Sequence, residues 1–412
     1  MGESSLDVAA IRARFPALGW TAADGCPFVW ADAPGGSQVP SEVIEAVAGR
    51  MREGASNTHG AFAASRAIDE VIAAAHTAGA DFLGCDPDEV VFGQNATSVL
   101  LHLSRSFSRT LGPDDEVVVT RLDHDANVRP WVLAARDAGA TVRWVDIDPA
   151  DVTLDLDSLD AALSDRTRLV ACTLASNAVG TTPPVGEVVR RAKAVGALVV
   201  LDGVHFAQHR LPGLHDSGAD ILATSPYKFF GPHQGMVAVR GDVLRSWEPY
   251  KLRPVDDVDP DRWETGTQSH ESMAGTIAAI DYLAGLGAGA MRRERLADAF
   301  AAIGAHEASL SARFLDGLGR IRGVRLFGIA DPGRLGERTS TFAIRLGEQH
   351  PLDTSAALAE RGIFTWDGHY YAIEVFERLG LLESGGAVRI GFCHYHLPDE
   401  VDRVLQALAD LS

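Results

Sequence analysis

The sequence has few cysteines, a deficit of basic residues and no long hydrophobic run. Its four cysteines form neither a Cys-x-x-Cys pair nor a disulfide framework, which is typical of a reducing compartment. With 37 basic against 56 acidic residues, the formal net charge of -19 repels phosphate backbones and anionic lipids. No apolar stretch reaches bilayer length, and the first residues lack a basic leader followed by an apolar segment. We therefore expect a soluble, cytoplasmic protein that binds neither nucleic acid nor membrane.

What the sequence does contain is a regular alternation of short β-rich runs and helical stretches between residues 90 and 239. The amphipathic stretch 185–195 is one of the helical segments that separate these runs. Such alternation is typical of an α/β fold with a mostly parallel sheet flanked by helices. We expect seven strands, at 90–92, 116–120, 141–145, 169–174, 197–202, 221–224 and 236–239.

After about residue 288 the composition changes to a long helical stretch rich in Ala, Leu, Arg and Glu, which ends near Leu318. Strands are then expected at 324–327, 341–346 and 388–392, and helices at 354–361 and 398–411. This is the pattern of a compact α+β unit. The chain is therefore expected to comprise an N-terminal segment (1–40) that packs on the small domain, a large domain (41–287) and a small C-terminal domain (288–412).

Two side chains of opposite charge end neighbouring strand-like runs. Lys228 follows the run 221–224 in Ser-Pro-Tyr-Lys, and Asp202 ends Ala-Leu-Val-Val-Leu-Asp. Ligands of such sheets gather at the carboxyl ends of the strands, where both residues are expected. Pyridoxal 5'-phosphate chemistry requires an amine that forms a Schiff base and an acid that keeps the pyridine nitrogen protonated. The pair therefore predicts an enzyme that uses this cofactor.

The segment Gly93–Thr97 follows a strand and opens a helical run to Phe107. Its backbone amides would face an anion placed on the helix N-terminus, which predicts a phosphate cradle. A capped strand-to-helix turn without a ligand explains the same motif equally well.

His124 lies between two acids in Asp-His-Asp-Ala-Asn, a pattern that a metal site could also produce. No second histidine stands at ligand spacing, so we expect no metal here, and we expect His394 and His396 to be structural. The better use of His124 is an imidazole laid on the cofactor ring, where it can also move protons near Cα.

Three further polar residues occur at or in strand-like runs. Asn177 and His205 could hydrogen-bond the phenolic oxygen of the cofactor, or could be turn-forming and satisfied buried polar groups. Arg389 could hold a substrate carboxylate through two parallel hydrogen bonds, or could be a surface charge on an edge strand.

Taken together, these motifs resemble class V pyridoxal phosphate enzymes of fold type I. Within that class the chain is similar to the group of cysteine desulfurases, selenocysteine lyases and isopenicillin N epimerase, over nearly its whole length. The motifs that carry the resemblance are Asp123-His124-x-Ala-Asn127, Ser176-Asn177-x-x-Gly180-Thr181, Asp202-Gly-Val-His205, Ser225-Pro-Tyr-Lys228 with Gly231-Pro232, Glu264-x-Gly266-Thr267 and Arg389.

The resemblance implies a role for each residue. Lys228 would carry the internal aldimine, Asp202 would pair with the pyridinium nitrogen and His124 would stack on the ring. Thr267 would reach the cofactor phosphate of a neighbouring subunit, which implies a homodimer with shared sites. His205 stands where desulfurases usually have glutamine, and is similar to the epimerase side of the family. The phosphate would be held by Asn95, Ala96, Ser225 and Tyr227.

The chain departs from the desulfurases at their nucleophile, a cysteine at the end of Gly-His-His-Cys. The corresponding run here is Asp367-Gly-His-Tyr-Tyr371, and a tyrosine cannot form a persulfide although it can donate a proton. We therefore expect a lyase that cleaves the Cβ–S bond of cysteine or of an S-substituted cysteine by β-elimination, without a persulfide cysteine. Tyr371, Tyr370 or His369 would protonate the leaving group, and the latter two would line the substrate site with Arg389.

Two other hypotheses remain open. An isopenicillin N epimerase-like epimerase or an aminotransferase would act on an amino acid without β-elimination, and His205 favours this reading. A non-catalytic scaffold would merely retain the fold, and the complete set of Lys228, Asp202 and Arg389 argues against it.

Overall fold

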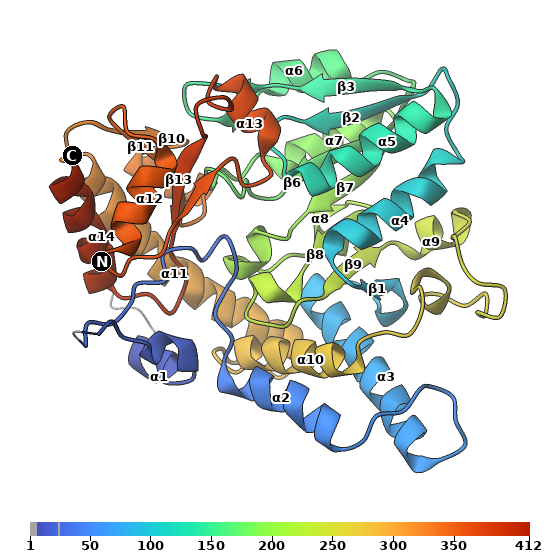
Figure 1. Ribbon diagram of the computed structural model, residues 1–412. Coiled ribbons are helices and arrows are strands. Elements are labelled where there is room, and N and C mark those ends of the chain that lie inside the picture. The colour runs from blue at the N-terminus through green and yellow to red at the C-terminus, as the bar shows by residue number, and fades with distance from the viewer. Residues whose placement is uncertain (1–5, 24) are drawn as a thin grey trace.

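The computed structural model describes residues 6–23 and 25–412, so residues 1–5, where we expected no leader, lie outside the described part. A seven-stranded sheet forms the centre of the larger part of the molecule (Figure 1). The order is β1-β9-β8-β7-β6-β2-β3, and the five strands from β8 to β3 are parallel. The strands are β1 (Val90–Gly93), β2 (Glu116–Thr120), β3 (Thr141–Val145), β6 (Thr167–Thr173), β7 (Leu198–Asp202), β8 (Ile221–Thr224) and β9 (Gly235–Val239).

All seven strands lie where the sequence predicts them, and the expected α/β class is confirmed. β9 runs antiparallel to both β8 and β1. The connection from Thr224 to Gly235 is short and contains a single 3-10 turn, whereas a parallel return needs a crossover of a dozen or more residues. The mixed edge of the sheet therefore follows from the length of this loop.

Both faces of the sheet are buried, because successive strand residues point to opposite sides. In β2, Val117 and Val119 pack with Phe107 and Trp131 of the helices on one face, and Val118 belongs to the core on the other. The helices of this part are α2 (Ser41–Arg52), α3 (Ala63–Leu83), α4 (Ala96–Ser108), α5 (Arg129–Ala138), α6 (Leu156–Ala162), α7 (Val185–Ala194), α8 (Leu214–Ser217), α9 (Gly241–Ser246) and α10 (His270–Ala284). A small hairpin of β4 (Ile147–Asp148) and β5 (Thr153–Leu154) stands beside the sheet.

The C-terminal part has its own antiparallel sheet, with the order β10-β11-β13-β12. β12 and α13 were not expected, since three and six residues are too few to show a hydrophobic period. The elements are α11 (Arg292–Leu318), β10 (Val324–Phe327), β11 (Thr341–Leu346), α12 (Pro351–Ala359), β12 (Trp366–Gly368), α13 (Ile373–Arg378), β13 (Ala387–Gly391) and α14 (Pro398–Leu411).

The chain after α1 (Val8–Arg12) connects the two parts. Val29 donates its backbone N–H to the Gly362 carbonyl (2.9 Å), and Ala31 accepts from the Gly391 amide (2.8 Å), so this segment extends the small sheet. The chain then turns into the larger part and passes the loop after β8. None of the described helices is long and apolar enough to cross a bilayer.

Candidate active site

Lys228 ends a 3-10 turn (Pro226–Lys228) that follows β8 directly. Its Nζ donates to two backbone carbonyls of the N-terminal segment, those of Pro34 and Gly35, the latter at 3.0 Å. Burial, and then the charge of Arg389, lower the pKa of Lys228 to about 7, although two nearby carboxylates act in the opposite direction. A large fraction of this amine is therefore uncharged and nucleophilic near neutral pH.

Asp202 ends β7 and lies opposite Ala223 of the parallel neighbour β8, so it shares a sheet edge with Lys228. One carboxylate oxygen accepts the Val204 N–H at 2.8 Å, and the residue is 5% exposed. Burial raises the pKa of Asp202 to about 6, while the Val204 bond and Lys228 lower it. A further positive charge in this place would stabilise the carboxylate.

The lowered pKa of Lys228 makes a prediction for the cofactor-free protein. From about pH 7 up to the usual lysine value of 10.5, the unfolded chain binds one proton more than the folded chain, so stability rises with pH. Lys228→Met should remove this rise, whereas Lys193→Met, which deletes an ion pair with Asp220, should leave it in place. Urea unfolding at several pH values above about 7 checks this. Equal pH dependence in wild type and Lys228→Met would contradict it.

The start of α4 meets the loop after β8. Asn95 caps the helix through its side chain, which accepts the Ser98 amide at 2.9 Å, and the Ala96 amide donates to the Ser225 hydroxyl at 3.3 Å. Gly235 of β9 passes so closely that an added Cβ would lie 2.4 Å from the Asn95 carbonyl carbon. The close approach of β9 therefore places the N-terminus of α4, the positive end of its dipole, next to Ser225. This is the arrangement that an anion-binding site needs.

Tyr227 precedes Lys228 and stacks on His233, with ring centroids 4.9 Å apart and planes 10° apart. Burial raises the pKa of Tyr227, so its hydroxyl stays protonated and can donate. It is the fourth residue expected to hold a phosphate.

His124 caps a 3-10 turn (Asp125–Asn127) after β2. Its Nδ1 accepts the Ala126 N–H at 3.0 Å, which leaves the ring proton on Nε2. Burial, followed by the charges of Lys228 and Arg389, lowers the pKa of His124 to about 4, so the ring is neutral at physiological pH. His124 is thus a neutral ring with one fixed N–H donor.

Two residues at strand ends have buried polar atoms that find no partner in the described part of the chain. Asn177 donates its Nδ2 to the Tyr370 carbonyl (2.8 Å), and its Oδ1 has none. His205 contacts two threonine hydroxyls through Nε2, and its Nδ1 has none. Buried polar atoms of this kind are costly unless a ligand or water pairs with them.

Arg389 lies in β13, between β11 and β12, and is 4% exposed, so the alternative of an edge-strand surface charge is wrong. Its guanidinium donates to Asp32 (3.0 Å) and to the Asn177 carbonyl (3.2 Å), and it lies over the Tyr370 ring at 4.5 Å. Among described residues its Nε has no partner. Sequence reasoning missed Asp32, because nothing in the local pattern distinguishes it from a turn residue.

The loop after β12 bridges the two parts of the molecule. Tyr370 and Tyr371 both have left-handed backbone, with φ of 50° and 59°, a conformation that non-glycine residues keep only when contacts hold them there. The Tyr371 carbonyl accepts the Asp125 amide (2.7 Å), and its amide donates to His369 Nδ1 (3.1 Å). Tyr370 is buried and donates its hydroxyl to the Ala387 carbonyl.

Tyr371 itself is 66% exposed, and its ring stacks on that of His124 with centroids 5.5 Å apart and planes 25° apart. Thr267 lies exposed in the loop before α10. Of the predicted site residues, the structure brings together those of the sheet edge and of the 369–371 loop, through the contacts given above.

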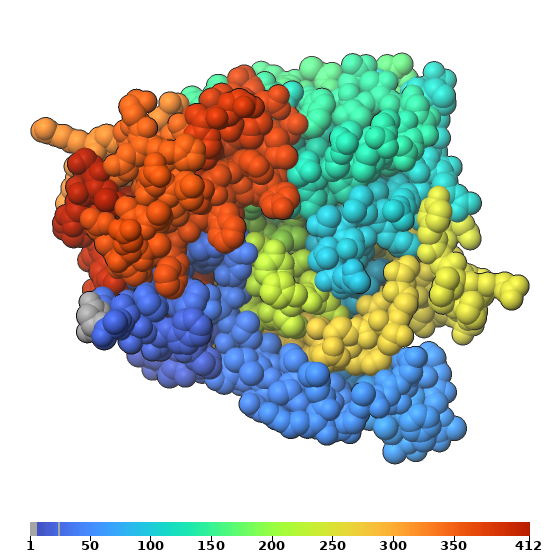
Figure 2. Space-filling model, in the orientation of Figure 1, coloured from blue at the N-terminus to red at the C-terminus, as the bar shows by residue number. Residues whose placement is uncertain are grey.

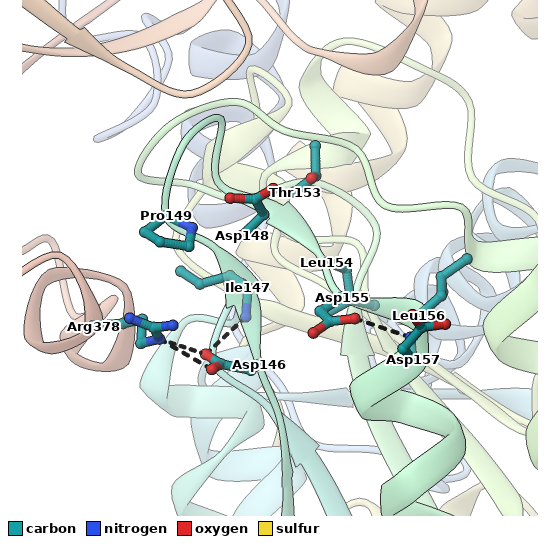
Figure 3. Close-up of a pocket in the computed structure, with 10 residues that line it drawn as sticks. All are labelled: Asp146, Ile147, Asp148, Pro149, Thr153, Leu154, Asp155, Leu156, Asp157 and Arg378. Carbon is teal, nitrogen blue, oxygen red and sulfur yellow. Dashed lines mark hydrogen bonds and ion pairs between the residues drawn. The ribbon is translucent and has the colours of Figure 1, made fainter.

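The surface is hollowed between the small sheet and α4, and the floor of this recess has the yellow-green colour of the segment after β8 (Figure 2). A separate hollow of about 560 Å³ lies beside the β4–β5 hairpin (Figure 3). It is lined by four aspartates, and its one arginine, Arg378, is already paired with Asp146 at 2.9 Å. This acidic hollow suits no phosphate.

One group of described side chains has metal-ligand spacing, and it lies elsewhere. Asp86, Glu89 and His215 approach one another at the turn before β1. Glu89 already accepts the amides of Asp86 (3.1 Å) and Gly241 (2.8 Å) and contacts His215 at 2.7 Å. These bonds explain the cluster as a capped turn.

A lysine with a lowered pKa, a carboxylate, a helix N-terminus and a neutral imidazole at one edge of a mostly parallel sheet are the features of a pyridoxal-phosphate-dependent enzyme of fold type I. Residues 29–404 match the family described as Aminotransferase class-V, and the chain belongs to that family.

The chain is 33% identical to a probable cysteine desulfurase of Mycobacterium leprae, over 97% of this chain and 95% of the relative. It is 30% identical to a probable cysteine desulfurase of Streptomyces coelicolor, over 98% of this chain and 96% of the relative. Among solved structures, an apo cysteine desulfurase from Thermococcus onnurineus superimposes with a TM-score of 0.87 at 25% identity, covering 100% of this chain and 99% of that one.

Proposed function

We propose that this protein is a pyridoxal-phosphate-dependent lyase that cleaves the Cβ–S bond of cysteine or of an S-substituted cysteine, and that no cysteine of the chain carries the sulfur. The observation that carries this proposal is the loop 369–371. This loop holds two tyrosines in left-handed backbone, one of them stacked on His124, and none of the four cysteines of the chain lies in it.

The residues of the site fit the cofactor. Asn95, Ala96, Ser225 and Tyr227 would hold its phosphate, and the unpaired His205 Nδ1 and Asn177 Oδ1 would meet its phenolic oxygen. Asp202 would face its ring nitrogen, His124 would cover its ring, and Lys228 would supply the amine that attaches it. When bound, the cofactor withdraws electrons from the Cα of an attached amino acid.

The chain's own groups divide the proton transfers. With a pKa of about 7, Lys228 can take the proton from the substrate Cα. His124 cannot take it, because its Nδ1 is occupied by the Ala126 amide and its Nε2 already carries a proton. Arg389 would hold the substrate carboxylate through its free Nε and the nitrogen that now contacts Asp32.

The leaving sulfur needs a proton rather than a protein nucleophile. Tyr371 is exposed and stacks on His124, so it can supply this proton, whereas the Tyr370 proton is held by the Ala387 carbonyl. Burial raises the pKa values of Cys85, Cys172 and Cys393, which disfavours the reactive thiolate. Cys26 lies in the N-terminal turn bridged by Thr21 and Pro27.

The proposal is tested by incubating the holoenzyme with cysteine, cysteine S-conjugates and other amino acids in deuterated water. Pyruvate and a free thiol in equal amounts are expected, with no sulfur bound to the protein by intact mass. Deuterium at Cα of otherwise intact substrate would instead identify an epimerase, and a keto acid that keeps its side chain would identify an aminotransferase. A cysteine persulfide on the protein would overturn the proposal.

Tyr371→Phe separates proton delivery from proton removal. General acid catalysis contributes ~10²–10⁴-fold, so thiol release should fall by at least about tenfold. Exchange of the Cα hydrogen should persist, because Lys228 is intact. The matched control is Tyr370→Phe, which removes a hydroxyl that the Ala387 carbonyl already occupies and should slow thiol release far less. An equal loss in both variants would count against Tyr371 as the donor.

The proposal includes a cytoplasmic homodimer in which Thr267 reaches the neighbouring site. The exposed position of Thr267, in the loop before α10, leaves it accessible to a neighbouring subunit and supports this arrangement. It also keeps the division into segments 1–40, 41–287 and 288–412, which the two separate sheets support.

A further inference from the structure

His205 lies three residues beyond the end of β7 and is 4% exposed. Its Nε2 lies 3.0 Å from the hydroxyl of Thr341, the first residue of β11, and 3.2 Å from that of Thr339, two residues earlier in the small domain. Its Nδ1 is buried without a hydrogen-bond partner among residues 6–23 and 25–412. Burial, then the charges of His209, Lys228 and Arg389, lower the pKa of His205 well below its usual value, so the ring is neutral.

The two hydroxyls decide which nitrogen carries the proton of this neutral ring. Thr339 donates its hydroxyl proton to the Gly180 carbonyl at 3.4 Å, so it can offer Nε2 only a lone pair. Thr341 is fully buried, and among the residues that the structure describes Nε2 of His205 is the acceptor that its hydroxyl reaches. If Nε2 carried the proton, the Thr341 proton and the Nδ1 lone pair would both be buried and unpaired, which is the costlier arrangement. Thr341 therefore donates to Nε2, and the ring proton is on Nδ1.

The orientation of the ring is fixed as well. His209 packs edge-on against it, with centroids 4.9 Å apart and planes 72° apart. His209 is held in turn by a 2.7 Å contact between its Nδ1 and the buried carboxylate of Glu307 on α11. With one side packed and Nε2 held, His205 cannot turn over to exchange its two nitrogens.

We propose that Thr341 is a positioning residue that fixes His205 as the Nδ1–H tautomer, so that the small domain sets a permanent hydrogen-bond donor in the cofactor site of the large domain. The assignment of the donor, Nδ1–H of His205, follows from the hydrogen bonds of His205, Thr339 and Thr341 given above. Its acceptor, the anionic phenolic oxygen of the cofactor, rests on the proposed function. Neither Thr339 nor Thr341 was singled out by sequence reasoning, because a threonine at the start of a strand is ordinary.

The test uses the cofactor-free protein with ¹⁵N-labelled histidine, in which the nitrogen chemical shifts and their couplings to ring protons report each tautomer. His205→Gln identifies the His205 signals by their loss. Wild type should show the Nδ1–H form. Thr341→Val should reverse it to Nε2–H, because the lone pair of Thr339 is then the remaining acceptor. The matched variant Thr339→Val should keep Nδ1–H, since the Thr341 proton is still present.

Cofactor binding gives a second readout. In Thr341→Val a nitrogen lone pair would face the anionic oxygen, so the dissociation constant from absorbance titration should rise by about tenfold, the loss of one charge-assisted hydrogen bond. Thr341→Ser should restore it, and Thr339→Val should change it by less than about threefold.

An Nε2–H signal for His205 in the wild type would overturn the inference, and this requires no variant to fold. An unchanged tautomer in folded Thr341→Val would overturn it too. If the tautomers behave as expected but the protein eliminates no thiol from any cysteine derivative, the lyase proposal fails and the role of Thr341 stands.

Discussion

Lys228→Ala is expected to reduce turnover of every amino-acid substrate by at least about 10³-fold, the scale on which removal of a covalent catalytic residue acts. The variant loses both the amine that attaches the cofactor and the base that takes the Cα proton. Borohydride reduction of the holoenzyme followed by peptide mass analysis should find the cofactor on Lys228 in wild type and on no peptide in the variant.

The labelling result is easy to interpret, because the chain has three lysines and each gives a different peptide. Lys193 is paired with Asp220 at 2.5 Å and Lys251 with Asp257 at 3.1 Å. Both amines are therefore held in ion pairs, and we expect neither to attach the cofactor. Lys251→Ala is the matched control and should retain labelling and activity. Labelling of Lys193 or Lys251 in the wild type would remove the basis of the proposed site.

Asp202→Asn is expected to lower kcat by about a hundredfold or more. With the cofactor bound, its carboxylate would pair with the ring nitrogen, and removal of one partner from a buried ion pair costs ~3–5 kcal/mol. An amide can donate to or accept from that nitrogen but cannot hold its charge. Single-turnover kinetics and the visible spectrum of the bound cofactor should both change.

The control for Asp202→Asn is its buried neighbour Asp123. This carboxyl accepts Asn127 Nδ2 at 2.8 Å and the Thr120 hydroxyl, and burial with the nearby Asp202 raises its pKa to about 7. Since Asp123 is already close to half-protonated at neutral pH, Asp123→Asn should have a much smaller effect. Comparable losses in the two variants would show that general charge removal, and not a contact with the ring, is responsible.

The pattern of the sequence was sufficient for the large sheet. Its strands are short apolar runs between amphipathic helices. This pattern can be read from neighbouring residues alone, and the structure has the strands at the predicted positions. Because β7 and β8 are parallel, Asp202 at the end of β7 and Lys228 in the turn after β8 lie at the same edge of the sheet. The cofactor was predicted from these two residues, and the family from the resemblance of the motifs along the whole chain.

The C-terminal part was less predictable. β12 pairs with β13 over only three residues, and it exists because β13 is already in place. The left-handed Tyr370 and Tyr371 have no sequence signature, since most residues that adopt this conformation are glycine. Whether Arg389 was buried or on an edge depended on β12, so the sequence left both options open.

By itself the sequence determined the class of fold and the sheet edge at which Lys228 and Asp202 lie, because short-range periodicity and position relative to the strands encode both. Only the tertiary structure decided that Arg389 pairs with Asp32, that Tyr371 stacks on His124 and that the Thr341 hydroxyl contacts His205. Each of these contacts joins residues more than 130 positions apart in the chain, and no local sequence pattern marks them. They form because packing brings the atoms together, which the spacing of residues along the chain does not encode.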